Sequence, residues 1–152
     1  MAAVLESVIR GDHTQLKDEI RITDIISPEN YQAEIQKIWK RAWVAVARTE
    51  DVPEPGSYKV VEMPTYKTSL LVTRDMKGTV RVFHNICRHR GNKLVREGSG
   101  HMRNFVCGFH GWAFATSGEL VLVTDETQFP NIDRSKLNLI PVHTEVWQGL
   151  VF

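Results

Sequence analysis

The spacing of apolar and polar residues predicts one helix near residues 28–42, followed by a series of strands. Ser27-Pro28-Glu29 supplies a capping hydroxyl, a proline at the first helical position and an acid in the first turn, which together indicate a helix start. Apolar residues then recur at helical spacing: Tyr31, Ile35, Ile38 and Ala42. We therefore expect a helix of about three to four turns, with Trp39 and Trp43 beside its apolar stripe as core or interface anchors.

From residue 43 the pattern changes to short apolar and β-branched runs separated by turn residues. Such a series predicts small antiparallel sheets. The expected strands cover residues 43–47, 58–63, 68–74, 79–85, 140–147 and 150–152, with a hairpin at 114–123. Gly98-Ser99-Gly100 and Gln148-Gly149 predict turns, and an irregular connection is expected around Pro130.

These patterns predict two parts of the chain. Residues 1–42 form an N-terminal arm and helix, of which the first 26 residues are weakly patterned, and residues 43–152 form a β domain. The fold class is therefore mainly β, with small antiparallel sheets preceded by a helix. A chain of 152 residues is long enough to bury a core in one such domain.

Charge and composition exclude several classes of function. The net charge of +1 gives no basic or acidic field, so nothing in the composition indicates a nucleic-acid or membrane-surface partner. The N-terminus lacks a basic region before its few apolar residues, and no apolar run is long enough to span a bilayer. We expect a cytoplasmic protein.

The chemistry of the chain is concentrated in residues 86–112. The sequence contains two cysteines, and each is followed closely by a histidine: Cys87-x-His89 and Cys107-x-x-His110. Two thiolates and two imidazoles make a complete ligand set for a soft transition-metal site. A zinc finger usually takes both cysteines from one knuckle and both histidines from the next. Mixed loops favour a two-metal Rieske [2Fe–2S] cluster, in which one iron binds both sulfurs and the other binds both nitrogens.

This ligand set has a redox consequence. Replacing two thiolates by neutral imidazoles removes negative charge, which favours reduction, so Rieske potentials lie at roughly −150 to +300 mV against about −400 mV for plant-type ferredoxins. With both cysteines in the cluster, none is left for a disulfide, which fits a reducing compartment. From the residues alone, two alternatives stay open: a zinc site, or buried structural thiols beside ordinary histidines.

Several neighbours of the ligands have expected roles. Glycines allow loop backbone to approach a cluster closely, and the sequence places them at Gly91, Gly108 and Gly111. Trp112 is expected to shield the second loop. Positive side chains next to the loops are either solvated or suited to an acidic partner: Arg88, Arg90 and Lys93. The other histidines of this part of the chain, His84, His101 and His143, lack ligand partners at suitable spacing.

The motifs C-x-H-R-G and C-x-x-H-G-W, separated by residues 92–106, resemble the Rieske domain of aromatic-ring-hydroxylating oxygenase α (large) subunits. The resemblance extends over roughly residues 25–152, from the helical entry at Tyr31 to the closing segment Gly149-Leu150-Val151-Phe152. It implies a Rieske-type fold with two cluster-binding loops. It also implies that Cys87 and Cys107 bind one iron and that His89 and His110 bind the other.

The resemblance implies partners as well. In that family a ferredoxin or flavin reductase delivers electrons to the Rieske domain. The domain passes them to a mononuclear non-haem Fe(II) in the catalytic domain of a neighbouring α subunit, usually in a homotrimer, for O₂-dependent hydroxylation of an aromatic compound. We expect that C-terminal catalytic domain to be absent here, so these residues should carry electrons but should not oxygenate a substrate alone. The alternatives are a stand-alone Rieske-type ferredoxin and a zinc-binding interaction module.

Cytochrome bc-type Rieske proteins offer a contrast. They carry an extra cysteine in each loop, joined as a disulfide, and a hydroxyl after the last glycine. This chain has Asn92, Gly108 and Trp112 at those positions. Losing those dipoles near the sulfurs should place the potential toward the low end of the Rieske range.

Overall fold

The computed structural model describes residues 22–96 and 98–152, so the weakly patterned arm at residues 1–21 lies outside the described residues. The chain divides into two compact units between Arg41 and Ala42. The sequence-based boundary at residues 42/43 falls at nearly the same place. The assignment of those two parts as an arm and a cluster-binding domain stays a prediction, because compactness alone says nothing about what a unit binds.

The predicted helix begins where expected and ends early. α2 (Ile22–Ile26) precedes α3 (Pro28–Glu34), and the Ser27 side chain accepts a hydrogen bond from the Asn30 N–H at 3.1 Å, which confirms the N-cap. α3 continues as a wide π-helical turn, η2 (Ile35–Trp39). The Lys40 N–H donates to the Ile35 carbonyl at 3.0 Å and closes this turn, so the expected extension to Ala42 is wrong.

The second unit is a β structure. Within residues 42–96 and 98–152, the strands form three small sheets with antiparallel pairing throughout, as the sequence predicts. The largest sheet has the order β4-β3-β2-β5, with β2 (Ser57–Met63), β3 (Thr68–Arg74), β4 (Val80–His84) and β5 (Ser99–His101). The second contains β6 (Asn104–Val106), β7 (Ala113–Ala115) and β8 (Leu120–Leu122). The third contains β1 (Ala47–Arg48), β10 (Leu150–Val151) and β9 (Val146–Trp147).

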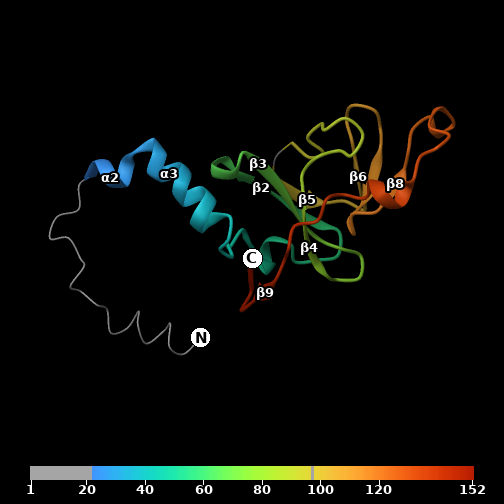
Figure 1. Ribbon diagram of the computed structural model, residues 1–152. Helices are drawn as coiled ribbons and strands as arrows, with labels where there is room; N and C mark the ends of the chain where they lie inside the picture. The colour runs from blue at the N-terminus through green and yellow to red at the C-terminus, as the bar shows by residue number, and fades with distance from the viewer. Residues whose placement is uncertain (1–21, 97) are drawn as a thin grey trace. The chain divides into compact units, whose positions relative to one another are not determined.

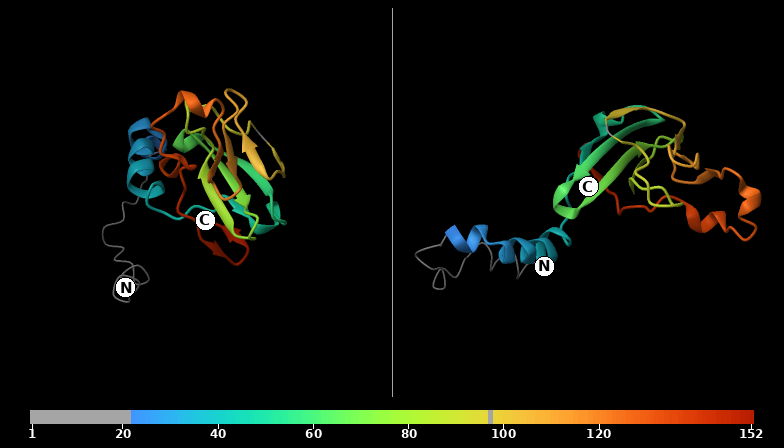
Figure 2. Two further views of the ribbon diagram at one scale, coloured as in Figure 1. Left: turned by 90° about the vertical axis from the view of Figure 1, so that its right-hand side faces the viewer. Right: turned by 90° about the horizontal axis from the view of Figure 1, so that it is seen from above.

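The β6–β8 sheet lies at one end of this unit. Figure 1 shows β6 and β8 beyond the end of the β2–β5 sheet, and the right view of Figure 2 shows the orange part of the chain, which includes β8, projecting from that sheet. Short 3₁₀ turns, η5 (Glu126–Gln128) and η6 (Arg134–Leu137), occupy the irregular connection expected around Pro130. The chain then returns along β4, where the His84 N–H donates to the Ile140 carbonyl at 2.9 Å.

Two expected strands are largely irregular. In residues 43–47 only the last residue joins a strand, because its partner strand β10 has two residues and the ladder ends there. In residues 140–147 only Val146 and Trp147 form a strand. Pro141, which has no N–H to donate, makes only an isolated bridge with Phe83.

One expected turn is instead a strand. Ser99 and Gly100 belong to β5 and pair with β2, where Gly100 lies opposite Tyr58. A Cβ at Gly100 would lie 3.2 Å from the Tyr58 ring, so the glycine lets the ring pack against the strand backbone. Glycine therefore marks a close approach at this position. The turn expected at Gln148-Gly149 is present, and both residues have positive φ.

The central strand β3 is buried on both faces. Leu71 points into one apolar core, between the β2–β5 sheet and the β6–β8 sheet, whereas Leu70 and Val72 point into the other, toward Val151 of β10. This alternation follows from the two-residue period of a strand. The first core also contains Cys87 and Cys107, so the packing that holds the sheets together also fixes the bases of the two predicted ligand loops.

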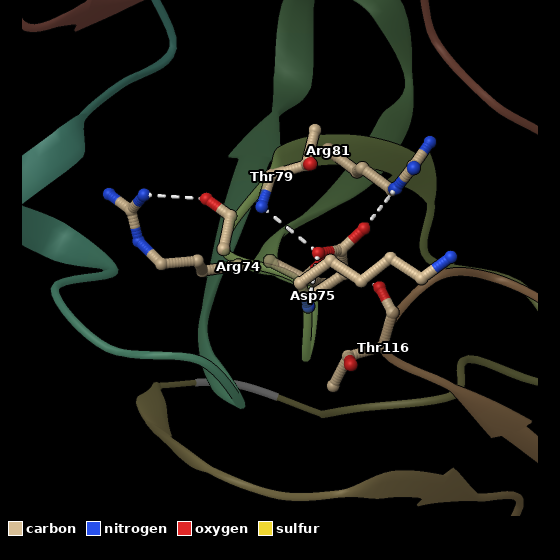
Figure 3. A network of polar contacts seen from close by, with 8 residues as sticks. Arg74, Asp75, Thr79, Arg81 and Thr116 are labelled. Atoms are coloured by element: carbon tan, nitrogen blue, oxygen red, sulfur yellow. Dashed lines mark hydrogen bonds and ion pairs between the residues drawn. The ribbon is translucent and has the colours of Figure 1, made fainter.

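Polar contacts fix the hairpin between β3 and β4, as Figure 3 shows. The Asp75 carboxylate is 2% exposed and accepts hydrogen bonds from Arg81 Nε at 2.7 Å and the Thr79 N–H at 2.9 Å. Burial alone would raise the pKa of Asp75, but these bonds and one from the Lys77 N–H outweigh it, so the pKa lies below its ordinary value. Nearby, Thr73 Oγ1 donates to the Thr116 carbonyl at 2.8 Å and links β3 to the β7–β8 turn.

Among the described residues, the longest and most apolar helices fall short of what a membrane crossing requires.

Candidate metal centre

The two predicted ligand loops have the same backbone. In the first, the Cys87 N–H donates to the Asn92 carbonyl at 2.8 Å and the Gly91 N–H donates to the Cys87 carbonyl at 3.0 Å. In the second loop the corresponding bonds run from Cys107 to Trp112 at 2.8 Å and from Gly111 to Cys107 at 2.9 Å. The two glycines adopt φ values of 72° and 73°. Each loop is therefore one six-residue turn that requires glycine at its fifth residue.

The same strand pairing closes each loop. Ile86 bridges Lys93 across the first loop, and Val106 pairs with Ala113 across the second. In both cases the paired residues directly precede the cysteine and follow the sixth loop residue. Two hairpins thus present their loops in the same way, and the loops differ chiefly in where the histidine stands, two residues after Cys87 and three after Cys107.

The two sulfurs lie at the buried base of the loops. Cys87 and Cys107 are each 3% exposed, free of a disulfide and in hydrogen-bonding contact with each other. Burial raises the pKa of the Cys87 thiol. Burial alone would also raise the pKa of Cys107, but N–H donors and the Cys87 thiol outweigh it, so the pKa of the Cys107 thiol is lowered. A thiolate is the form that binds metal, and the N–H donors at these sulfurs favour it.

Backbone N–H groups face both sulfurs. Those of His89 and Arg90 point at Cys87, and those of Phe109 and His110 point at Cys107. These are the second and third residues after each cysteine, so the donors follow the shared loop conformation. Such N–H groups stabilise negative charge on cysteine sulfur, which is what metal-bound thiolates carry.

The two imidazoles lie together, as two ligands of one metal ion would. The ring centroids of His89 and His110 are 4.7 Å apart at an interplanar angle of 68°. Burial, then the nearby His110 and Arg90, lower the pKa of His89, so its ring is neutral near pH 7. Its Nδ1 atom is buried and has no hydrogen-bond partner among the described residues. A buried ring nitrogen left without a partner is costly, and a bond to a metal ion would satisfy it.

Aromatic residues enclose the imidazole of His89. Trp112, 3% exposed, stacks on it at 4.7 Å with an interplanar angle of 9°. Phe129 packs edge-on against both rings, at 5.8 Å from His89 and 5.7 Å from Trp112. Trp112 was expected to shield the second loop, but the ring that it covers, His89, belongs to the first loop. The role of Phe129 was not expected; its signal is the one aromatic residue in the connection at residues 125–138.

The connection at residues 125–138 holds the two loops together. Arg88 donates to the Lys136 carbonyl at 3.2 Å from the first loop. Arg134 donates to the Val121 carbonyl at 2.7 Å on β8, the strand that pairs with β7 after the second loop, and forms an ion pair with Glu126 at 3.2 Å. Arg88 thus joins the first loop to this segment, and Arg134 joins the segment to β8, which pairs with the strand after the second loop. Arg88 is partly buried in this contact and is not a freely solvated charge.

Other residues singled out from the sequence lie around the site or away from it. Arg90 and Gly108 are exposed, and a Cβ at Gly108 would meet open space. Lys93 pairs with Glu62 at 2.6 Å. Among the histidines, His84 contacts Thr68 at 3.2 Å, His101 contacts the Pro55 carbonyl at 2.7 Å and His143 is exposed. Position 108 therefore has room for a side chain, and the expected close approach of the backbone does not require glycine there.

The described residues contain no group of three or more His, Cys, Asp or Glu side chains placed to hold one metal ion. A Rieske cluster does not require such a group, because each of its two irons takes only two protein ligands. The observed pairing of two thiols and two imidazoles, with one imidazole nitrogen unsatisfied, fits that donor set.

Comparisons with known proteins agree with this geometry. Residues 42–138 match the family described as "Rieske [2Fe-2S] domain". The chain is similar to chlorobenzene dioxygenase subunit alpha of Cupriavidus sp. (strain PS12), with 33% identity over 80% of this chain and 27% of the relative. Biphenyl 2,3-dioxygenase subunit alpha of Rhodococcus jostii (strain RHA1) gives 33% identity over 80% of this chain and 26% of the relative. The chain thus spans about a quarter of the length of these relatives.

Solved structures show the same likeness. Naphthalene 1,2-dioxygenase from Rhodococcus sp. superimposes with a TM-score of 0.79 and 32% identity, covering 85% of this chain and 30% of that one. A quaternary ammonium Rieske monooxygenase gives a TM-score of 0.77 and 25% identity, covering 85% and 35%. Together with the mirrored loops and their paired thiols and imidazoles, these matches show that the chain belongs to the Rieske [2Fe–2S] domain family and is homologous to the Rieske region of ring-hydroxylating dioxygenase α subunits.

Proposed function

We propose that Cys87, His89, Cys107 and His110 hold a [2Fe–2S] cluster, with both sulfurs on one iron and both imidazoles on the other, and that this domain transfers electrons. The observation that carries the proposal is the convergence of two buried thiols and two adjacent imidazoles from mirrored loops, one imidazole having a buried and unpartnered Nδ1. When bound, such a cluster accepts and donates one electron at a time.

The site has a buried side and an exposed side. The cysteines are buried in the apolar core, whereas His110 is only partly buried and the adjacent Phe109 is 60% exposed. The rings of His110 and Phe109 lie 3.9 Å apart. The imidazole edge is therefore the side that a partner protein can reach, while the core and Trp112 keep water away from the sulfurs and from one face of His89.

We infer a larger setting from the relatives. The matched proteins are α subunits or large components of dioxygenases, and the structure of the quaternary ammonium monooxygenase is described with inter-subunit electron transfer. In this setting a ferredoxin or flavin reductase delivers electrons to the domain. The acceptor is a mononuclear Fe(II) in the catalytic domain of a neighbouring α subunit of a homotrimer in the cytoplasm, where an aromatic compound is hydroxylated.

The test is to purify the full chain and measure iron, acid-labile sulfide and zinc. We expect about two irons and two sulfides per chain, matching the cluster composition. The EPR spectrum should be silent when oxidised and rhombic, with a low average g value, after reduction with dithionite. Stoichiometric zinc without labile sulfide, in protein produced with ample iron, would contradict the electron-transfer function.

A further inference from the structure

Asn92 occupies the same place in the first loop that Trp112 occupies in the second, five residues after the cysteine. Each of these residues reaches across to the opposite loop. Trp112 stacks on the His89 ring, and the side-chain Nδ2 of Asn92 donates to Cys107 Sγ at 3.6 Å. The other described donors to the two sulfurs are backbone N–H groups and the cysteine thiols. Among the described residues, Asn92 therefore supplies the one donor from a side chain that is not a cysteine.

A second hydrogen bond fixes the orientation of this amide. The same Nδ2 atom donates to the Lys93 carbonyl at 3.0 Å, so its two hydrogens have two acceptors. The reversed amide would place Oδ1, which is only an acceptor, against a carbonyl oxygen and a sulfur. The contacts therefore require the N–H group of Asn92 to face Cys107.

We propose that Asn92 is a positioning residue that sets the reduction potential of the site by donating its side-chain N–H to Cys107 Sγ. Reduction adds negative charge, and an N–H donor on a ligand sulfur stabilises the more negative state, which raises the potential. This inference rests on the proposed binding of the cluster by Cys107.

The proposal changes what position 92 means. Compared with cytochrome bc-type Rieske proteins, this position lacks a disulfide cysteine, and that lack alone predicts a lower potential. The structure places a hydrogen-bond donor there instead, aimed at a ligand sulfur. Asn92 therefore returns part of the stabilisation of negative charge that the missing disulfide would have provided, and it acts only on the sulfur of the second loop.

The test compares reduction potentials of variants of the 152-residue chain with the cluster loaded. Asn92→Leu removes the donor at similar volume, and we expect the equilibrium constant for reduction to fall by up to about tenfold, or ~59 mV for one electron. Asn92→Gln keeps an amide and should recover part of the change. The matched control is Asn104→Leu, the same substitution at an exposed position on β6, three residues before Cys107, where no change is expected.

The outcomes separate this inference from the proposed function. Iron and sulfide are measured first on the unaltered chain, and their absence would contradict the function itself. Equal potentials for the unaltered chain and Asn92→Leu, both fully loaded, would overturn only the role of Asn92. If Asn92→Leu fails to load, pulsed EPR of the reduced unaltered chain, labelled with ¹⁵N at asparagine side-chain amides, decides the matter. A ¹⁵N coupling supports the hydrogen bond, and its absence overturns it.

Discussion

The two predicted ligand loops share one backbone conformation and differ in their side chains. The same hydrogen bonds, the same positive-φ glycine and the same flanking strand pair form both turns, yet the histidine stands two residues after Cys87 and three after Cys107. The sixth residue also differs, since Asn92 in the first loop reaches a sulfur and Trp112 in the second reaches an imidazole. The comparison shows that the backbone fixes where the sulfurs lie, while the side chains decide the chemistry.

The most severe way to break the comparison is to remove a ligand from each loop. Cys87→Ser and Cys107→Ser should each lose all bound iron and sulfide, because one iron needs both sulfurs. His89→Ala and His110→Ala should lose them as well. Iron and sulfide content and the visible spectrum measure the effect. His143→Ala, an exposed histidine, is the control and should keep a full cluster. A normal cluster in either serine variant would contradict the assignment.

The residues that cross between the loops should differ widely in their contribution to stability. Trp112→Ala removes a buried ring packed on His89 and Phe129, and should cost about 3–5 kcal/mol. Asn92→Ala, at an exposed residue, should cost about 0.5 kcal/mol. Urea unfolding followed by far-UV circular dichroism measures both. Similar losses of stability in the two variants would show that the loops do not divide packing and electrostatics in this way.

The two loop glycines allow a finer comparison. Gly91→Ala and Gly111→Ala both place a side chain in left-handed backbone, which costs about 1–2 kcal/mol. At Gly111 the new Cβ would also lie 2.7 Å from Thr124 Oγ1, whereas at Gly91 its nearest contact is Ile86 at 3.6 Å. We expect Gly111→Ala to be less stable by about a further 1 kcal/mol.

Thr124→Ala supplies the control for this difference. In the Gly111→Ala background it removes the atom that the new Cβ would meet, so it should bring the free energy of unfolding close to that of Gly91→Ala. If the double variant is no more stable than Gly111→Ala, the extra cost does not come from Thr124.

The smallest expected effect is a difference in pH dependence. The pKa of Asp75 is lower in the folded chain than its ordinary value of 3.8, because hydrogen bonds outweigh burial. Its stabilising contribution is therefore complete at neutral pH and is lost as the pH falls below about 5 toward the folded pKa. With Asp75→Asn, the free energy of unfolding should fall less steeply as the pH is lowered.

Asp75 belongs to the β3–β4 hairpin, and β4 leads into the first loop. The loss of stability in acid therefore tests whether this hairpin depends on the Asp75 carboxylate. Unfolding free energies of Asp75→Asn and the unaltered chain are compared between pH 7 and pH 3. Asp133→Asn, at an exposed carboxylate whose pKa is also lowered, serves as the control and should change the slope less. An equal slope for all three chains would remove Asp75 as a source of acid sensitivity.

The sequence was sufficient to predict the Rieske domain, the β class and most hairpins, because these depend on local signals. The assignment of the four ligands stays a prediction. Ser27 caps the helix as expected, and the turns at Gly118 and Gly149 have the positive φ that glycine favours. The equivalence of the loops was hidden by the unequal Cys–His spacing. Its signal is the glycine four residues after each cysteine, which is required by the backbone and not by the metal ligands.

The remainder depended on distant partners. Residues 43–47 have the composition of a strand, but their partner ends after two residues. Gly98-Ser99-Gly100 has the composition of a turn, but Gly100 pairs with Tyr58 of β2 and lies against its ring. The donor role of Asn92 depends on a sulfur fifteen residues away in sequence, which only the packing of the two hairpins brings within reach.

The shared turn makes each loop a transplantable unit. Its shape depends on main-chain hydrogen bonds, one glycine and an antiparallel pair of residues at its ends, so a hairpin in another protein that offers such a pair could carry it. The histidine and the sixth residue are not part of that frame and can be exchanged independently. For the design of metalloproteins, two copies of one turn with different side chains supply both halves of a bimetallic site.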